Sequence, residues 1–188
     1  GANQGLLVGQ QQRHSGHPGE VQGGKPGQFG EIIARGPNVM LGYWKREKET
    51  ADALQEGYMH TGDVATIDAD NYIYIVDRAK DMIISGGENV YPTEVEVVLA
   101  RHPSIHEISV IGIPSEEWGE TVCAIVVVRP GMSLSADELI AWSRERLAHF
   151  KCPRVVTFRD VLPRNETGKV MRRTLRAPYW SGKDRAVG

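Results

Sequence analysis

The sequence has little of several features that would assign a class of protein at once. Among 188 residues there are only two cysteines, Cys123 and Cys152, and aromatic residues make up 7%. Two cysteines are too few for a disulfide framework, and Cys123 lies in the apolar run TVCAIVVV, as a small core residue would. We therefore expect a reduced, cytoplasmic setting, and we assign neither cysteine a chemical role.

The chain also lacks an excess of charge of one sign and a long uncharged apolar run. Its 22 Lys and Arg residues against 24 Asp and Glu residues give a formal net charge of −2 at pH 7. Without a basic excess, nucleic acid is not an expected partner. No run is long and apolar enough for a membrane span, and the N-terminus has neither the basic flank nor the apolar core of a secretory signal.

Histidine pairs with the spacing of metal ligands are few. His14 with His17 and His102 with His106 are each interrupted by a glycine or a proline, and no second pair of ligands follows either of them. A structural zinc site needs four ligands. The sequence therefore predicts no metal site.

Composition divides the first part of the chain. Residues 1–28 are rich in Gly, Gln and Pro, with few aliphatic residues after Val8, so they cannot bury enough surface to offset their ordering entropy and predict a mobile arm. Apolar runs predict strands at residues 29–36 and 72–77. The polar segment 45–54 predicts a short surface helix between them.

The second part of the chain is more regularly patterned. Two capping-box patterns, Thr93 with Glu96 and Ser135 with Glu138, predict helix starts, and the second helix is expected to end near Lys151. Runs rich in β-branched residues predict strands at residues 107–114, 121–128 and 154–158, and a basic helix is expected at the end of residues 163–176. Strands and helices interleave without the spacing of a doubly wound sheet, which predicts an α+β fold.

Three short motifs could carry chemistry. In HTGD, residues 60–63, Asp63 is expected in a tight loop, where its carboxylate could accept hydrogen bonds from a vicinal diol or could simply cap a turn. The paired glycines of SGGENVYP, residues 85–92, could approach a phosphate or form an ordinary turn. The lysine of TGK, Lys169, could contact a transferring phosphate or could be an ordinary solvated lysine.

The order of these motifs is more informative than any one of them. GPNVMLGYW, GYMHTGD, VDRAKDMIISGGENVYPTEVE and PRNETGKVMRRTLR follow one another along the chain. Over residues 29–179 the sequence resembles the C-terminal part of the acyl-adenylate-forming enzymes, the acyl-CoA synthetase and luciferase superfamily. The resemblance implies a ligase that joins a carboxylic acid to CoA through an acyl adenylate, using ATP that would bring magnesium with it.

The resemblance also implies roles for single residues. Asp63 would bind the ribose hydroxyls of the nucleotide, and Arg78 and Thr61 would be further nucleotide-binding residues. Lys80 would be the hinge about which the C-terminal domain swings between two poses. Lys169 would be the catalytic lysine of the adenylation step.

A second group would serve CoA. The resemblance places Gly86 and Gly87 along the pantetheine tunnel, and Trp118, Gly119 and Glu120 near the nucleotide of CoA. The loop GGENVYP is closer to the ligases of fatty and aromatic acids than to the peptide synthetases, so CoA is the expected acceptor. Asn71 stands where the family often has glycine, and the turn there should tolerate it.

The resemblance finally implies a domain organisation. Residues 1–28 are unmatched, 29–79 would end the large AMP-binding domain, 80–180 would form the C-terminal domain, and 181–188 a tail. That second domain should contain a three-stranded sheet with packed helices and a short hairpin.

Most of the large domain is missing from the resemblance, including its phosphate loop and acid pocket. We therefore expect no activity from this chain alone, and a partnership with a large N-terminal domain in cis or in trans. Exposed apolar surface should favour self-association. Two alternatives stay open: a lid that acts in trans or without catalysis, and a basic face at residues 172–176 that contacts a carrier protein or nucleic acid.

Overall fold

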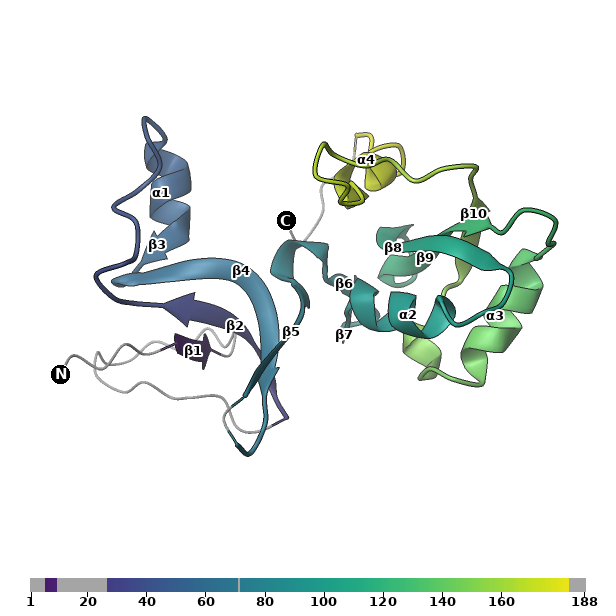
Figure 1. The fold of residues 1–188 in the computed structure, drawn as a ribbon, viewed down its shortest axis with the longest axis horizontal. Coiled ribbons are helices and arrows are strands. Elements are labelled where there is room, and N and C mark those ends of the chain that lie inside the picture. Colours follow the sequence, from purple (N-terminus) through teal and green to yellow (C-terminus); the bar gives the residue numbers. More distant parts are fainter. Residues whose placement is uncertain (1–5, 10–26, 71, 183–188) are drawn as a thin grey trace. The chain divides into compact units, whose positions relative to one another are not determined.

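The computed structural model describes residues 6–9, 27–70 and 72–182, and it is an α+β fold, as predicted (Figure 1). The chain divides into two compact units, Gly1–Ala79 (unit 1) and Lys80–Gly188 (unit 2). Among the residues just named, no helix is long and apolar enough to cross a membrane.

Unit 1 is built on an antiparallel sheet. The strands are β1 (Leu6–Gly9), β2 (Phe29–Ala34), β3 (Leu54–Gln55), β4 (Tyr58–Ile67) and β5 (Ile73–Arg78), and the long β4 pairs with β2, β3 and β5. Helix α1 (Glu47–Ala53) contributes no buried side chain, which fits the predicted surface helix. Ile32 and Ala65 form a small core with Ile73 packed against it.

Both strands predicted for unit 1 are confirmed, but strand β1 was not predicted. The runs at 29–36 and 72–77 form β2 and β5. Within the predicted arm, residues 6–9 pair with β2, because β2 offers their backbone groups a ladder that composition alone cannot reveal. Residues 1–5 and 10–26 of the predicted arm lie outside the described residues, as does Asn71.

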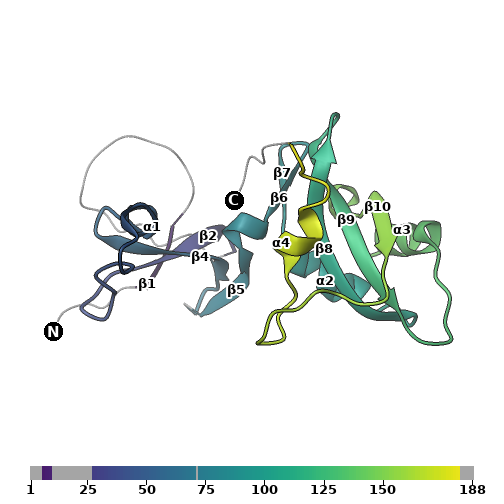
Figure 2. The same ribbon diagram turned by 90° about the horizontal axis from the view of Figure 1, so that it is seen from above.

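Unit 2 is built around one long antiparallel hairpin (Figure 2). Strands β8 (Ile105–Ser115) and β9 (Gly119–Val128) pair along their length, and β10 (Val155–Phe158) adds to β9 in parallel. The short hairpin of β6 (Ile83–Ser85) and β7 (Glu88–Val90) joins β9 at Ser85 and Gly119. The remaining elements are helices α2 (Pro92–Leu99), α3 (Ala136–Arg144) and α4 (Arg172–Arg176), with 3-10 turns η1 (Ala79–Asp81) and η2 (His149–Lys151).

Strand β9 is apolar from Val122 to Val128, as expected of a strand that is buried on both faces. One face packs under α2 and α3, where Val122, Ala124 and Val126 meet a core that includes Leu139. The opposite face packs under α4, and Cys123 and Ile125 contribute to that second core. The two layers of helices can be followed on either side of the sheet in Figure 1.

Both cysteines are buried and free, which confirms the core position predicted for Cys123. Burial raises the pKa of the Cys123 thiol to about 11. The thiol is therefore protonated at neutral pH and is a poor nucleophile.

The two capping-box predictions have different outcomes. Ser135 and Glu138 form the predicted box, with both reciprocal hydrogen bonds, at the start of α3. The box predicted for Thr93 and Glu96 is wrong, because α2 begins at Pro92 and its N-cap residue makes no side-chain cap. The Glu96 carboxylate instead accepts a hydrogen bond from the Val110 amide at 2.7 Å.

Helix α3 ends at Arg144, earlier than the predicted end near Lys151. Ala148 adopts an extended ψ of 142°, which a continuing helix cannot include. Leu147 and Phe150 still pack against the core below α2 and α3, from the turn that follows the helix. The apolar residues near Lys151 therefore belong to the core, although the helix does not extend to them.

Candidate functional site

Asp63 lies within strand β4, so the prediction of a tight loop is wrong. Gly62 has a φ of +72°, and a register shift follows between Val64 and Ala65, but pairing with β2 and β5 continues on both sides. Glycine accommodates the left-handed conformation inside the strand without ending it.

Two residues predicted to bind nucleotide meet across the β4 and β5 ladder. Asp63 is paired with Arg78 in register, and Arg78 Nε lies 2.8 Å from Asp63 Oδ1. The Asp63 side chain is 26% exposed, so it is half-sheltered and still reachable from solvent. A carboxylate beside a guanidinium offers acceptors to a diol and donors to a phosphate.

Thr61 supports this pair. Its hydroxyl donates to the Ile32 carbonyl at 2.7 Å and accepts from the Asp63 amide at 3.1 Å. These bonds join β4 to β2 and fix the backbone at Asp63. The structure therefore gives the Thr61 hydroxyl a backbone-supporting position.

Glu31 belongs to the same site and was missed by the sequence analysis. Its carboxylate accepts from the Gly62 amide at 2.9 Å and lies 2.9 Å from His60 Nδ1. Glu31 and Gly62 are 31 residues apart in sequence, and only the pairing of β2 with β4 brings them together. No local pattern could have identified it.

The paired glycines form the two-residue turn between β6 and β7. Gly86 and Gly87 have φ values of +60° and +85°, as the favoured hairpin turns with positive φ at both positions require. The Gly86 amide donates to the Trp118 carbonyl at 2.9 Å, and a Cβ at Gly86 would lie 2.8 Å from Trp118 Cε3. A Cβ at Gly87 would meet nothing within 4 Å.

Of the five residues assigned to CoA, the structure brings four close together at the β6–β7 turn and places the Glu120 side chain apart from them. Trp118 and Gly119 lie directly against the Gly86 turn. Glu120 is 3% exposed, and its carboxylate occupies the space beside Gly112 in the sheet. Trp118 is also stacked by the exposed Arg154, whose Cζ lies 4.3 Å from the ring centroid, a contact that the sequence analysis missed.

Lys80 and Lys169 both belong to unit 2. Lys80 lies in η1, and its carbonyl accepts from Arg176 Nη1 at 3.3 Å. Lys169 is exposed on a turn between β10 and α4, which is closed by an isolated bridge between Arg164 and Val170. Gly168, with a φ of +81°, provides the reversal just before the lysine.

The basic helix does not present a free basic face. Arg172 reaches Glu96 at 2.7 Å and Asp81 at 3.4 Å, and Arg176 reaches Asp81 at 2.9 Å. These two arginines serve to attach α4 to α2 and η1. The alternative of a basic contact surface at residues 172–176 therefore loses two of its three cations.

The arrangement offers no metal centre in the described ranges. Within residues 6–9, 27–70 and 72–182, no group of three or more His, Cys, Asp or Glu side chains could hold an ion. The His, Cys, Asp and Glu side chains of these ranges therefore do not form a magnesium site of their own.

Comparison with known proteins decides the family. Residues 94–169 match the AMP-binding enzyme C-terminal domain, and Lys169 is the last residue of the match. These residues are an AMP-binding enzyme C-terminal domain. The resemblance seen in the motifs is confirmed.

Relatives of this AMP-binding enzyme domain include several CoA ligases. A feruloyl-CoA synthase of Amycolatopsis sp is 51% identical over 154 residues, which cover 82% of this chain and 31% of the relative. A long-chain-fatty-acid–CoA ligase of Escherichia coli O157:H7 is 46% identical over 151 residues, or 80% of this chain and 27% of the relative.

A solved structure agrees with the curated relatives. The o-succinylbenzoate CoA synthetase of Bacillus subtilis, in complex with an acyl-adenylate intermediate, matches with a TM-score of 0.77 and 36% identity, over 98% of this chain and 34% of that one. The chain thus spans about a third or less of the proteins it matches.

Proposed function

We propose that the chain works as the C-terminal part of an acyl-CoA synthetase. A carboxylate would attack the α-phosphate of ATP, giving an acyl adenylate and pyrophosphate, and the CoA thiol would then displace AMP. The observation that carries the proposal is the AMP-binding C-terminal domain with an exposed lysine, Lys169, at the end of the match.

Lys169 would act in the adenylation step. Negative charge builds on the oxygens of the α-phosphate as the carboxylate attacks, and an ammonium aimed at them stabilises the transition state more than the ground state. The Asp63 carboxylate would accept hydrogen bonds from the ribose hydroxyls, and Thr61 would hold the backbone of Asp63 in place. Arg78 would be the second nucleotide contact. Magnesium would arrive with ATP, as part of the substrate.

The β6–β7 turn and the residues around it would serve CoA. Lys80 would be the hinge that brings the Gly86 and Gly87 turn to the thioester-forming pose, where its lack of side chains leaves room for pantetheine. Trp118 and Gly119 would lie near the CoA nucleotide. Glu120, buried beside Gly112, would support the strand behind them.

The acid substrate would be fatty or aromatic. The relatives include a ligase named for each class, and the acid pocket would lie in a large N-terminal domain supplied in cis or in trans. The chain alone is expected to be inactive, because the described residues provide no phosphate loop. A cytoplasmic location stays a prediction from cysteine usage.

A chimera would test the proposed function. Residues 29–182 would replace the matching part of the Amycolatopsis feruloyl-CoA synthase, and ferulate-dependent pyrophosphate release and thioester formation would be measured. We expect activity, and a loss of about 100-fold or more with Lys169→Ala, because a charge-stabilising group is removed. Arg173→Ala, which removes a nearby exposed cation, is the control and should leave the activity intact. Equal activity in the Lys169→Ala and unchanged chimeras would refute the role of Lys169.

The lid alternative needs a separate assay. The 188-residue chain would be mixed with the complete feruloyl-CoA synthase in which the lysine equivalent to Lys169 is replaced by alanine. Restored thioester formation would support action in trans, and the absence of restoration beside an active chimera would favour action in cis.

Self-association of the isolated chain is a further expectation. Unit 1 exposes large apolar side chains on the loop before α1, at Leu41 (100%) and Trp44 (86%), and just before and within β5, at Tyr72 (67%) and Ile75 (66%). Light scattering should show a mass that rises with concentration, and Ile75→Glu should reduce the rise because it charges the patch. Val97→Glu, at an exposed apolar residue of unit 2, is the matched control. A monomer at every concentration would contradict this expectation.

A further inference from the structure

Five hydrogen bonds close the turn that carries Lys169. The Asn165 amide donates to the Lys169 carbonyl at 3.0 Å, and the Gly168 amide donates to the Asn165 carbonyl at 2.9 Å. Three more donors converge on Asn165 Oδ1: the Lys169 amide at 2.8 Å, the Thr167 hydroxyl at 2.8 Å and the Thr167 amide at 3.1 Å. One side-chain oxygen thus holds the backbone on both sides of Gly168.

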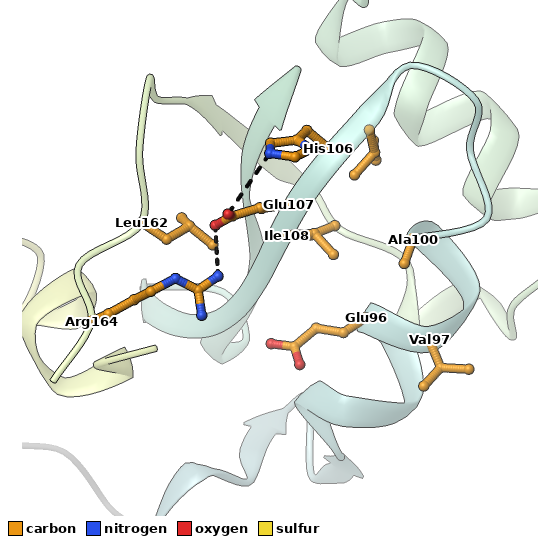
Figure 3. A pocket seen from close by; sticks show the side chains of 9 residues that line it. Glu96, Val97, Ala100, His106, Glu107, Ile108, Leu162 and Arg164 are labelled. Atoms are coloured by element: carbon orange, nitrogen blue, oxygen red, sulfur yellow. Dashed lines mark hydrogen bonds and ion pairs between the residues drawn. The ribbon is translucent and has the colours of Figure 1, made fainter. Parts of the chain in front are cut away.

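A second link ties this turn to the sheet. Arg164 Nη1 donates to the Gly168 carbonyl at 2.7 Å, while its Nη2 lies 2.9 Å from Glu107 Oε2. Figure 3 shows the guanidinium of Arg164 reaching Glu107 on β8, with His106 beside the same carboxylate. Strand β8 is part of the main hairpin of unit 2. Arg164 therefore fixes the position of the turn relative to the most extensively paired strands of the unit.

The Lys169 side chain has no such support. Across the residues that the structure describes, its ammonium makes no hydrogen bond or ion pair, and its stem has four rotatable bonds. The place from which the stem starts is therefore set by the backbone. A misplacement of about 1 Å in a reacting group can cost about 100-fold in rate.

We propose that Asn165 and Arg164 are positioning residues, which fix the backbone from which Lys169 reaches the reacting phosphate. The proposal rests on the proposed function of Lys169. Asn165 acts as an acceptor, so the oxygen of its side chain matters and its amino group does not. Arg164 acts by hydrogen bonding to the Gly168 carbonyl, and its contact with Glu107 on β8 keeps the turn in place relative to that strand.

Hydrogen exchange in the 188-residue chain tests the geometry without any assay of activity. With Asn165→Ala, amide exchange at Thr167 and Lys169 should accelerate about tenfold, since their shared acceptor is gone. Asn165→Asp keeps an acceptor oxygen and should restore most of the protection. Glu166→Ala, an exposed neighbour, is the control, and amides in β9 should be unchanged in all three variants. Unchanged exchange at Lys169 in Asn165→Ala would overturn the proposal.

The chimera provides the catalytic measurement. Asn165→Ala should lower kcat for pyrophosphate release about tenfold or more with little change in the KM for the acid, and Asn165→Asp should recover it. Arg164→Gln should lower kcat in the same direction. Loss of activity in Lys169→Ala with full activity in Asn165→Ala would refute the positioning role and leave the proposed function standing. Equal activity of Lys169→Ala and the unchanged chimera would refute the proposed function instead, while the exchange data still decide the geometry.

Discussion

Replacing Arg172 by methionine should destabilise unit 2 by about 3 kcal/mol, because it leaves the largely buried Glu96 carboxylate without its guanidinium partner and removes one of the two guanidinium groups at Asp81. Arg172 and Glu96 are each 19% exposed and Asp81 is 13% exposed, so water can replace the lost guanidinium only in part. Asp81 keeps its 2.9 Å contact with Arg176, which places the loss at the lower end of the range for broken buried pairs. Amide exchange in β9, which reports global opening of unit 2, would measure the change.

Arg173 on the same helix supplies the control. It is exposed, so Arg173→Met makes the same change of residue type without uncovering a buried carboxylate, and it should alter stability by less than about 0.5 kcal/mol. Equal losses in the two variants would show that the ion pairs at Arg172 contribute nothing specific. Helix α4 begins at Arg172, shortly after the turn that carries Lys169.

Gly86→Ala should destabilise the β6–β7 hairpin by about 2–5 kcal/mol. A left-handed conformation costs a residue with a Cβ about 1–2 kcal/mol. The new Cβ would also lie 2.8 Å from the Trp118 ring, and overpacking of this kind typically costs about 1–3 kcal/mol. Exchange of the amide at position 86, which donates to the Trp118 carbonyl, and Trp118 fluorescence would report the change.

Gly87→Ala separates the two causes. Its φ of +85° imposes the backbone strain, but its Cβ would point into open space, so only about 1–2 kcal/mol should be lost. If both variants lose the same amount, contact with Trp118 is not what requires glycine at position 86. A smaller loss for Gly86→Ala than for Gly87→Ala would refute the packing argument altogether.

Local sequence predicted elements where the deciding contacts are local. The box of Ser135 and Glu138 is complete within four residues, and it formed. The same pattern at Thr93 failed because Pro92 occupies the first turn of α2, and because Glu96 is engaged by β8 and Arg172. Long-range partners decided that case.

The candidate site shows the same division. The family resemblance brought Asp63 and Arg78 to one site, and their cross-strand pairing is found in the structure. Glu31 and the pair of Arg164 with Glu107 were not foreseen, because each depends on which strands become neighbours. Pairings across 31 and 57 residues leave no periodic trace in a sequence.

The parallel pairing of β10 with β9 has a consequence for how unit 2 folds. Strands β8 and β9 are joined by a tight connection, so their ladder can grow from one end with little loss of chain entropy. Strand β10 can pair with β9 only after the long connection through α3 has been ordered, which costs more chain entropy. The hairpin is therefore expected to form early and β10 late. Because the Lys169 turn follows β10 in the chain, this turn would be the last part of the unit to acquire its final geometry.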